Sequence, residues 1–489
     1  MEILPSQKQF EELSQRSKRV PVCGQIEFPK LNISALFQKF FSDSESAFLF
    51  ESGKGPDSTA RYTMMGEADS CLIKIKGHSA FVTENGSTIT EDIYDGFNRM
   101  NFDEDVMPAD YLQHFCGGWV GYIGYETGMF FESLSSIKPD DLDLPDCYFM
   151  RVTRLFVYDH KTQLLKYIIS ENNTVNKTGY NNLVKEIDSI LKNSQTILPE
   201  ENGAAKPPYS AHRLRANMTA SAYKERVTKA KSYIREGDIY QANLSQRFET
   251  DFDGDPFALY QNLQEVNPSP FSGYLKFGDL VLVSSSPERL VKVEGNRIET
   301  RPIAGTRPRG FTSEADQSLT RELLLNEKER AEHLMLVDLE RNDLGRICEM
   351  GSVEVTDLMF LEQYSHVSHI VSNIIGNLKP GTTVKDILKA VFPGGTITGC
   401  PKIRCMEIIN ELEPVKRGPY SGSFGYIGFS RQMDFNIIIR TIVLKSGKAY
   451  FHVGAGIVAD SDPESEYQET LHKAAAMIEV LGGQLSQDE

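Results

Sequence analysis

The chain has 489 residues, 40% of them hydrophobic, which is enough apolar material for a large folded core. Its formal net charge of −16, with basic residues scattered rather than gathered in a stripe, argues against nucleic acid and anionic membrane surfaces as partners. The seven cysteines form no CxxC pair, and neither a signal sequence nor a run of about 20 apolar residues occurs, so we expect a cytoplasmic protein with reduced thiols.

The first part of the chain, up to about residue 190, alternates between apolar and polar residues as strands do. The clearest segments are 46–52, 71–77 and 154–160. This pattern predicts a sheet with a few helices.

A segment rich in Pro, Gly, Ala and polar residues follows and predicts a surface linker. It divides the chain into an N-terminal region, 1–193, the linker, 194–218, and a C-terminal region, 219–489. We expect the two regions to form one large intertwined unit.

Helix and strand alternate after the linker. Residues 218–236 have apolar side chains at helical spacing and precede Gly237, whereas 240–252 alternate as a strand. Near the end of the chain, a strand that ends in glycines, 447–462, precedes a helix that ends at Gly482.

Two of the predicted helices carry pairs of glutamates three residues apart, Glu329 with Glu332 and Glu466 with Glu469. Both carboxylates of such a pair project from one helix face. Four carboxylates around one cavity require a cation, and hard oxygen ligands suit Mg²⁺. Such pairs also occur on ordinary solvated helix faces, so their spacing alone does not establish a metal site.

The segment 391–414 places a glycine-rich turn before a helix, whose first N–H groups could hold an anion such as a carboxylate. A simple turn before a core helix explains the same pattern. The segment is not a P-loop, and the glycines at 454–456 do not form a dinucleotide fingerprint.

Eight motifs in order resemble the chorismate-utilising enzymes, specifically component I of aminodeoxychorismate synthase and of anthranilate synthase. They are GDIYQANLSQRF, SSSPERLV, ETRPIAGTRPRG, ERAEHLMLVDLERNDLGR, YSHVSHIVS, FPGGTITGCPKIRCMEIINELEP, MDFNIIIRTI and GAGIVADSDPESEYQETLHK. FLFES and GGWVGYIGYE extend the resemblance over almost the whole chain.

The resemblance implies an α/β fold, an α+β sandwich of two large antiparallel sheets with outer helices. It makes Glu332 and Glu469 the direct Mg²⁺ ligands, with Glu329 and Glu466 holding metal-bound water or completing the shell. The metal would bind the ring carboxylate of chorismate. The expected contacts to substrate are Tyr420, Arg440, Gly456, Lys473, Ala304 and Thr306.

The resemblance also assigns catalytic roles. Loss of a ring hydroxyl requires a proton donor, and Glu288 matches the proposed acid of the family. A buried carboxyl has a raised pKa and stays protonated. His369 and Thr396 match residues lining the same site. Gln241 stands where relatives that add water carry a Lys base, which argues for ammonia as the nucleophile.

The two aminating branches of the family differ at several positions. Ala304 in RPIAGT is typical of anthranilate synthases. Many aminodeoxychorismate synthases carry a nucleophilic Lys at this position. Asn243 and the segment NPSPF favour the aminodeoxychorismate branch, which we prefer. Lys402 is one imaginable substitute for the missing nucleophile, and direct amination without a covalent intermediate is equally open.

The resemblance further assigns a tryptophan pocket, which serves feedback inhibition in anthranilate synthases. We expect weak or no inhibition of this protein by tryptophan. The matching residues are Glu51, Ser52, Asn267, Pro268, Ser269, Pro270 and Phe271.

The sequence has no recognisable glutaminase motif, because none of its cysteines lies in a nucleophile-elbow context. We therefore expect a separate glutamine amidotransferase subunit or free ammonium to supply ammonia for the reaction with chorismate. The alternative of another class is a non-catalytic sensor of chorismate or tryptophan.

Overall fold

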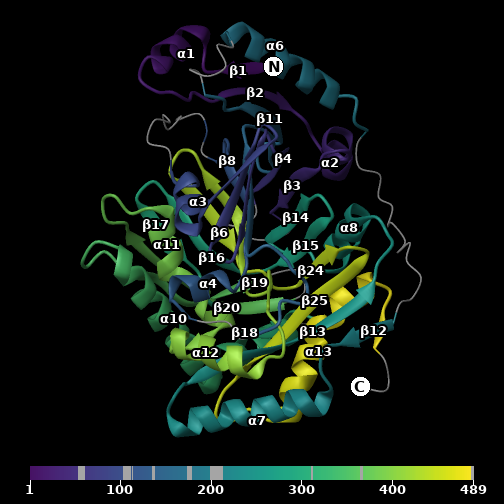
Figure 1. Ribbon diagram of the computed structural model, residues 1–489, viewed down its shortest axis with the longest axis vertical. Helices are drawn as coiled ribbons and strands as arrows, with labels where there is room; N and C mark the ends of the chain where they lie inside the picture. Colours follow the sequence, from purple (N-terminus) through teal and green to yellow (C-terminus); the bar gives the residue numbers. More distant parts are fainter. Residues whose placement is uncertain are drawn as a thin grey trace.

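The computed structural model describes residues 1–52, 61–102, 112, 114–134, 138–172, 179–198, 213–309, 312–363 and 367–485. Two large sheets dominate it, with helices packed around them (Figure 1). The expected α+β sandwich of two large antiparallel sheets is confirmed. Most of the predicted linker, residues 199–212, lies outside the described residues.

The first sheet is antiparallel except for its parallel β12–β26 edge. In spatial order its strands are β1 (Glu2–Leu4), β2 (Val22–Glu27), β11 (Leu164–Ile169), β10 (Arg154–Asp159), β4 (Tyr62–Glu67), β3 (Ser46–Glu51), β14 (Phe271–Phe277), β15 (Leu280–Ser286), β24 (Thr441–Lys445), β25 (Lys448–Ile457), β13 (Gln241–Asp251), β12 (Arg213–Ala216) and β26 (Gln484–Leu485), with β21 (Gly399–Cys400) paired to β13.

The second sheet is antiparallel throughout its described strands. In spatial order they are β18 (Ile303–Pro308), β20 (Val367–Asn377), β17 (Arg297–Thr300), β16 (Arg289–Glu294), β23 (Gln432–Asn436), β22 (Ser423–Gly428), β8 (Gly118–Ile123), β9 (Cys147–Val152), β5 (Cys71–Lys76), β6 (Ser79–Glu84) and β7 (Ser87–Asp92), with β19 (Glu354–Gln363) paired to β20.

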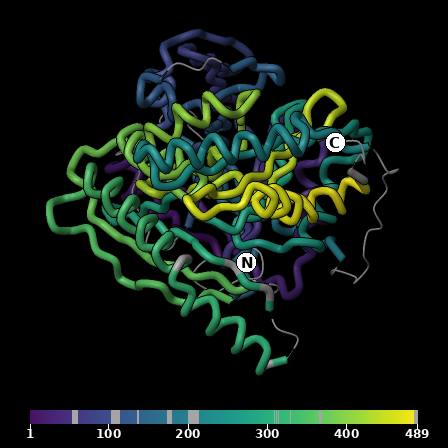
Figure 2. The backbone as a smooth tube through the Cα atoms, turned by 90° about the horizontal axis from the view of Figure 1, so that it is seen from below, coloured from purple at the N-terminus to yellow at the C-terminus, as the bar shows by residue number. Residues whose placement is uncertain are grey.

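The helices lie on the faces and ends of these sheets, and Figure 2 shows α13 beside α7. None of the described helices is long and apolar enough to cross a membrane. The described helices are α1 (Gln7–Ser14), α2 (Ile33–Phe41), α3 (Ile93–Arg99), α4 (Thr127–Phe131), α6 (Tyr180–Ser194), α7 (Ala220–Glu236), α8 (Pro256–Val266), α9 (Ser313–Leu325), α10 (Glu327–Ile347), α11 (Val384–Val391), α12 (Lys402–Leu412) and α13 (Pro463–Val480), and the 3₁₀ turn η1 (Gly395–Ile397).

Local signals in the sequence set the ends of these elements. Thr219 caps α7 by accepting a hydrogen bond from the N–H of Ala222, and Gly237 ends the helix in the left-handed region, with φ 85°. Asp462 caps α13 in the same way, accepting from Ser465, and Gly482 follows with φ 61°. The two helices predicted to end at Gly237 and Gly482 are therefore confirmed.

Both sheets combine strands from the two sides of the predicted linker. In the first sheet β3 pairs with β14, so that Leu49 lies opposite Tyr274. In the second sheet β8 pairs with β22 along its whole length. The division of the chain at 194–218 stays a prediction about the sequence, because neither sheet separates along it.

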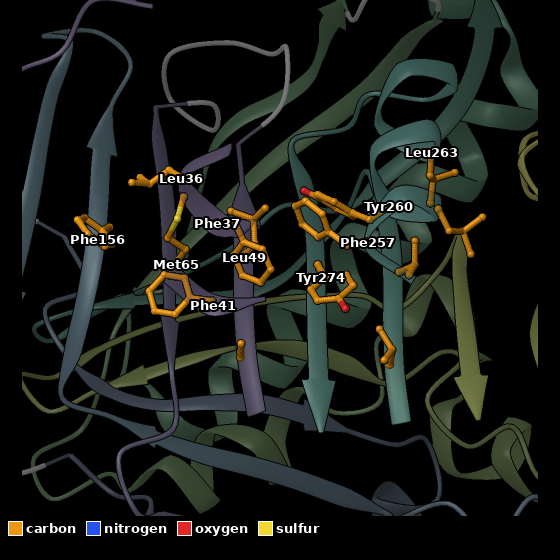
Figure 3. Close-up of a cluster of buried hydrophobic side chains, with 14 of the residues drawn as sticks. Leu36, Phe37, Phe41, Leu49, Met65, Phe156, Phe257, Tyr260, Leu263 and Tyr274 are labelled. Atoms are coloured by element: carbon orange, nitrogen blue, oxygen red, sulfur yellow. The ribbon is translucent and has the colours of Figure 1, made fainter. Parts of the chain in front are cut away.

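An aromatic cluster packs the β3–β14 seam from one face (Figure 3). Phe37 on α2 stacks on Phe257 of α8 with ring centroids 4.8 Å apart, and it meets the edge of Tyr274 at 5.6 Å. Such ring contacts add to the free energy of burying the apolar area. The cluster fixes the N-terminal strands against the strands that follow the linker.

We predict that Phe37→Ala lowers the free energy of unfolding by about 3–5 kcal/mol, because it removes a fully packed ring and leaves a cavity. Denaturant unfolding followed by circular dichroism measures this change. Ile89→Ala, at a position 51% exposed, is the control and should change stability by less than about 0.5 kcal/mol. Equal effects of the two substitutions would contradict the role of the cluster.

Candidate active site

Glu288 lies in the short connection between β15 and β16, where two backbone contacts hold it. Its N–H donates to Ser286 Oγ at 3.4 Å, and its carbonyl accepts from the N–H of Ile437 at 2.9 Å. The residue is only 6% exposed. The turn therefore presents a carboxyl group inside the protein, at the junction of the two sheets.

Burial raises the pKa of Glu288 to about 7. The Thr396 side chain, the backbone at Ile303 and the charges of Arg440 and Lys473 oppose this shift. Four of the residues predicted for the site, Glu288, Thr396, Arg440 and Lys473, are thus close enough to interact. A carboxyl group with this pKa is partly protonated at neutral pH and is able to donate a proton.

His369 lies on β20 and is 3% exposed. Its Nδ1 is 3.4 Å from the carbonyl oxygen of Gly305. Burial and the charge of Arg440 lower its pKa to about 4, so the imidazole is neutral at neutral pH. Ala304 and Thr306 lie on the neighbouring β18, where Thr306 is opposite His369, but the Thr306 side chain lies outside the described residues.

Two glycines of β25, Gly454 and Gly456, pair with the start of β13 and form a cradle that carries no side chains of its own. A methyl group on Gly456 would lie 2.6 Å from Gln241 Nε2, and one on Gly454 would lie 2.6 Å from Asn243 Oδ1 and 2.7 Å from the Tyr420 hydroxyl. Gln241 Oε1 and Asn243 Oδ1 are buried and have no hydrogen-bond partner among the described residues. These oxygens are the kind of group that a bound polar ligand satisfies.

Tyr420 and Lys473 close this cradle. The Tyr420 ring stacks on His452, with centroids 5.0 Å apart, and burial raises the pKa of its hydroxyl to about 12. Lys473 Nζ donates to the carbonyl of Gly454 at 3.0 Å and pairs with Glu469 at 2.7 Å. A neutral hydroxyl and an ammonium group therefore flank the glycines, a combination suited to a carboxylate ligand.

Lys402 stands apart from these contacts. Its Nζ donates to Asp343 at 2.6 Å and to the carbonyl of Val391 at 3.1 Å, and both side chains of the ion pair are largely buried. The structure thus shows Lys402 as an ion-pair partner, joining α10 to the start of α12. Its role as a substitute nucleophile stays a prediction.

The predicted metal ligands lie on two separate helices, α10 and α13. Glu329 Oε1 accepts from Arg307 at 2.7 Å, whereas its Oε2 is buried against Gly305 and has no partner among the described residues. Glu469 pairs with Lys473. No three acidic, His or Cys side chains of the described residues are close enough together to hold an ion.

The chemistry of this set still fits Mg²⁺, because Glu329, Glu332, Glu466 and Glu469 offer carboxylate oxygens and one of these oxygens is buried without a partner. In the present arrangement Arg307 and Lys473 neutralise one glutamate of each pair. The metal site stays a prediction.

The expected tryptophan pocket corresponds to a cavity of about 920 Å³. Glu51, Ser52, Pro270 and Phe271 line it, and Glu51 accepts a hydrogen bond from the Tyr260 hydroxyl at 2.6 Å. The other three predicted residues, Asn267, Pro268 and Ser269, come directly before Pro270 in the chain. Arg289, the residue after Glu288, also lines this cavity, and tryptophan binding stays a prediction.

Two residues gain importance only from the structure. Asn243 served in the sequence to separate two branches of a family, yet its side chain faces the same glycine as Tyr420. No motif in the sequence marks Arg417, although its side chain contacts the backbone of two site segments. The only signal in the sequence was its position three residues before Tyr420.

Known proteins match this chain over almost its whole length. Residues 45–479 match the model of a family described as chorismate binding enzyme. Anthranilate synthase component 1 of Acetivibrio thermocellus is 41% identical over 94% of this chain and 95% of that protein. Aminodeoxychorismate synthase component 1 of Bacillus subtilis (strain 168) is 40% identical over 97% of this chain and 99% of that protein.

Solved structures show the same similarity. Anthranilate synthase component I from Streptococcus pneumoniae TIGR4 superimposes with a TM-score of 0.75 at 36% identity, covering 86% of this chain and 92% of that chain.

We predict that Glu288→Gln stabilises the folded protein at pH 8. The pKa of Glu288 is higher in the folded than in the unfolded chain, so its contribution to stability is complete below about pH 4.5 and is lost as the pH rises through about 7. Removing the carboxylate should raise the free energy of unfolding by on the order of 3 kcal/mol at pH 8.

Thermal unfolding of both proteins at pH 5 and pH 8, without added metal or ligand, measures this effect. The advantage of the variant should grow between the two values. A constant difference would mean that Glu288 ionises in the folded state as it does in water.

Proposed function

The chain belongs to the chorismate binding enzymes, and on this premise we propose that it replaces a ring hydroxyl of chorismate with an amino group derived from ammonia. The product that we propose is 4-amino-4-deoxychorismate, a precursor of 4-aminobenzoate and folate. The observation that carries this proposal is the buried carboxyl of Glu288, which interacts with two cationic side chains, Arg440 and Lys473.

Glu288 would act as the general acid. Hydroxide is a poor leaving group, so the departing ring oxygen must receive a proton as its bond to carbon breaks. The pKa of about 7 keeps a share of Glu288 protonated at neutral pH, and the Thr396 side chain lies beside the carboxyl group. His369, whose pKa is lowered to about 4, would offer a neutral ring to the substrate rather than a charge.

Local positive charge explains how a protein with a net charge of −16 would collect an anion. Arg440 is largely buried beside Glu288, and Lys473 lies at the Gly454 cradle. We assign these two cations, with the Tyr420 hydroxyl and the backbone at Gly456, to the carboxylates of chorismate. Gly456 has no side chain of its own, and the Gln241 amide lies against its backbone.

Gln241 supports ammonia rather than water as the nucleophile. Its amide lies against Gly456 with a buried oxygen that has no partner among the described residues. A neutral amide cannot remove a proton from water, but its oxygen can accept a hydrogen bond from ammonia. We therefore assign Gln241 to hold the incoming nitrogen.

Mg²⁺ is the cofactor that we propose, held by Glu329, Glu332, Glu466 and Glu469. When bound, it would neutralise the ring carboxylate of the substrate. The residues of the chain would then orient the ring, exclude water and donate the proton.

Anthranilate synthase component I is the second candidate function, and Ala304 favours it. This residue leaves β18 without an amine opposite Ile370, where a covalent route through lysine would need one. The relatives also include both kinds of enzyme at nearly equal identity. Asn243, whose side chain reaches the Gly454 cradle, favours amination to the aminodeoxy product.

A glutamine amidotransferase subunit is the proposed source of ammonia. The relatives are named as component 1 of their enzymes, which implies a second component. Co-purification of a glutaminase that makes turnover glutamine-dependent would support the proposal. Turnover that remains strictly dependent on ammonium in its presence would contradict it.

The product assay decides between the candidates. Purified protein is incubated with chorismate, Mg²⁺ and ammonium, with and without the lyase that converts aminodeoxychorismate to 4-aminobenzoate. We expect lyase-dependent 4-aminobenzoate, identified by chromatography and mass. Fluorescent anthranilate with pyruvate, formed without the lyase, would instead establish the second candidate, and no product in either case would favour a sensor.

We predict that kcat falls as the pH rises through about 7, because the proton donor is then lost. Glu288→Gln should strongly lower turnover, and the residual rate should no longer fall as the pH rises through about 7. Glu332→Gln and Glu469→Gln should remove the response of turnover to Mg²⁺. A Glu332→Gln enzyme with an unchanged response would contradict the proposed metal ligands.

A further inference from the structure

Arg417 lies in the loop between α12 and β22, and its side chain is 2% exposed. A guanidinium group buried to this extent needs a counter-charge and acceptors for its N–H groups. Glu413 supplies the charge, because Nε donates to its Oε2 at 2.9 Å and Nη2 donates to its Oε1 at 2.6 Å. The pair is a planar, two-point contact whose geometry fixes the guanidinium plane.

Glu413 is itself held on the other side. Its Oε1 accepts from the backbone N–H of Ser245 at 2.8 Å and from Ser245 Oγ at 2.9 Å. Although burial opposes ionisation, the charge and hydrogen bonds of Arg417 keep the pKa of Glu413 below its usual value. The ion pair is therefore fixed to the middle of β13.

Two of the remaining N–H groups of Arg417 bind backbone carbonyls from distant parts of the chain, and Nη1 also donates to Ser421 Oγ at 3.2 Å. Nη1 donates to the carbonyl of Ile397 at 3.0 Å, and Nη2 donates to the carbonyl of Asn243 at 2.7 Å. Ile397 follows Thr396, whose side chain lies close enough to Glu288 to lower its pKa, while Thr396 Oγ1 makes no hydrogen bond among the described residues. Asn243 places its side-chain oxygen at the Gly454 cradle.

The flat face of the guanidinium contacts aromatic rings. Its carbon lies 4.6 Å from the ring centre of Tyr125 and 5.5 Å from that of Tyr420. The backbone of the loop is also tied, because the N–H groups of Arg417 and Gly418 donate to the buried carboxyl of Glu126 at 2.8 and 3.0 Å. Arg417 thus contacts three segments that each carry a residue assigned to the site.

We propose that Arg417 is a positioning residue, whose guanidinium sets the relative placement of Thr396, Asn243 and Tyr420 and thereby aligns the proton donor with the bound substrate. This inference rests on the proposed function for the roles of Glu288 and Tyr420. Lysine cannot replace arginine here, because a single ammonium group cannot reach one carboxylate and two carbonyls in a common plane.

The test compares Arg417→Lys with a matched control, Arg247→Lys. Arg247 is also buried, pairs with Asp141 through two N–H groups and lies over the ring of Tyr450, but its described contacts include none of the assigned site residues. Both variants should melt at lower temperature than the wild type. Assays are made well below the melting temperature of each protein.

We expect kcat/KM with chorismate and ammonium to fall about 100-fold in Arg417→Lys and less than about threefold in the control, because small errors of alignment are costly in catalysis. The fall of kcat with rising pH should also move to higher pH in Arg417→Lys. The Thr396 side chain lowers the pKa of Glu288, so a misplaced Thr396 allows that pKa to rise.

A second readout requires no turnover, namely the rise in melting temperature that chorismate with Mg²⁺ produces. Arg417→Lys should lose most of this rise, and the control should keep it. If Arg417→Lys does not fold, Glu413→Gln, which preserves the shape and one acceptor oxygen but removes the counter-charge, should show the same changes to a smaller degree.

Wild-type kinetics, pH profile and ligand response in a folded Arg417→Lys would overturn the inference, as would equal losses in Arg417→Lys and the control. Failure of the proposed function appears separately, as a wild-type protein without amination product. The ligand response still tests Arg417 in that case.

Discussion

The ladder between β13 and β25 is the constraint on which the site depends. Its register places Asn243 opposite Gly456 and Ser245 opposite Gly454. Because these glycines carry no side chains, the groups of Gln241, Asn243 and Tyr420 occupy the space above them. A shift of one residue would turn every side chain of β13 to the other face and empty the cradle.

The same ladder anchors the elements that bring charge to the site. α13 follows β25 and delivers Lys473, and β21 pairs with the start of β13 beside Gln241. The Arg417–Glu413 pair attaches to β13 from the other side. Lys473, the cradle and the Arg417–Glu413 pair therefore share one reference strand pair, and such a fixed frame holds groups in alignment without reorganisation.

Burial at the candidate site would serve the proposed chemistry at the expense of stability. Glu288 in water would be ionised at neutral pH, whereas its position between the sheets raises its pKa to about 7. His369 is kept neutral for the same reason. The free-energy cost of burying these groups is offset by the large hydrophobic cores elsewhere, including the aromatic cluster at the β3–β14 seam.

The sequence by itself determined the local elements, the family and the type of the reacting groups. Alternation at 46–52 and 154–160 gave strands, because the period of side chains in a strand is two, and Gly237 and Gly482 ended helices, because they adopt positive φ without strain. The motifs around Glu288 and Lys473 indicated an acid and an anion contact.

The tertiary structure decided what depends on contacts between distant segments. The pairing of Lys402 with Asp343 and the hydrogen bond of Arg417 to Asn243 join residues 59 and 174 positions apart, and neither propensity nor spacing encodes such contacts. The pKa of Glu288 belongs to the same class. Its value follows from desolvation and surrounding charge, which exist only once the two sheets have closed around the residue.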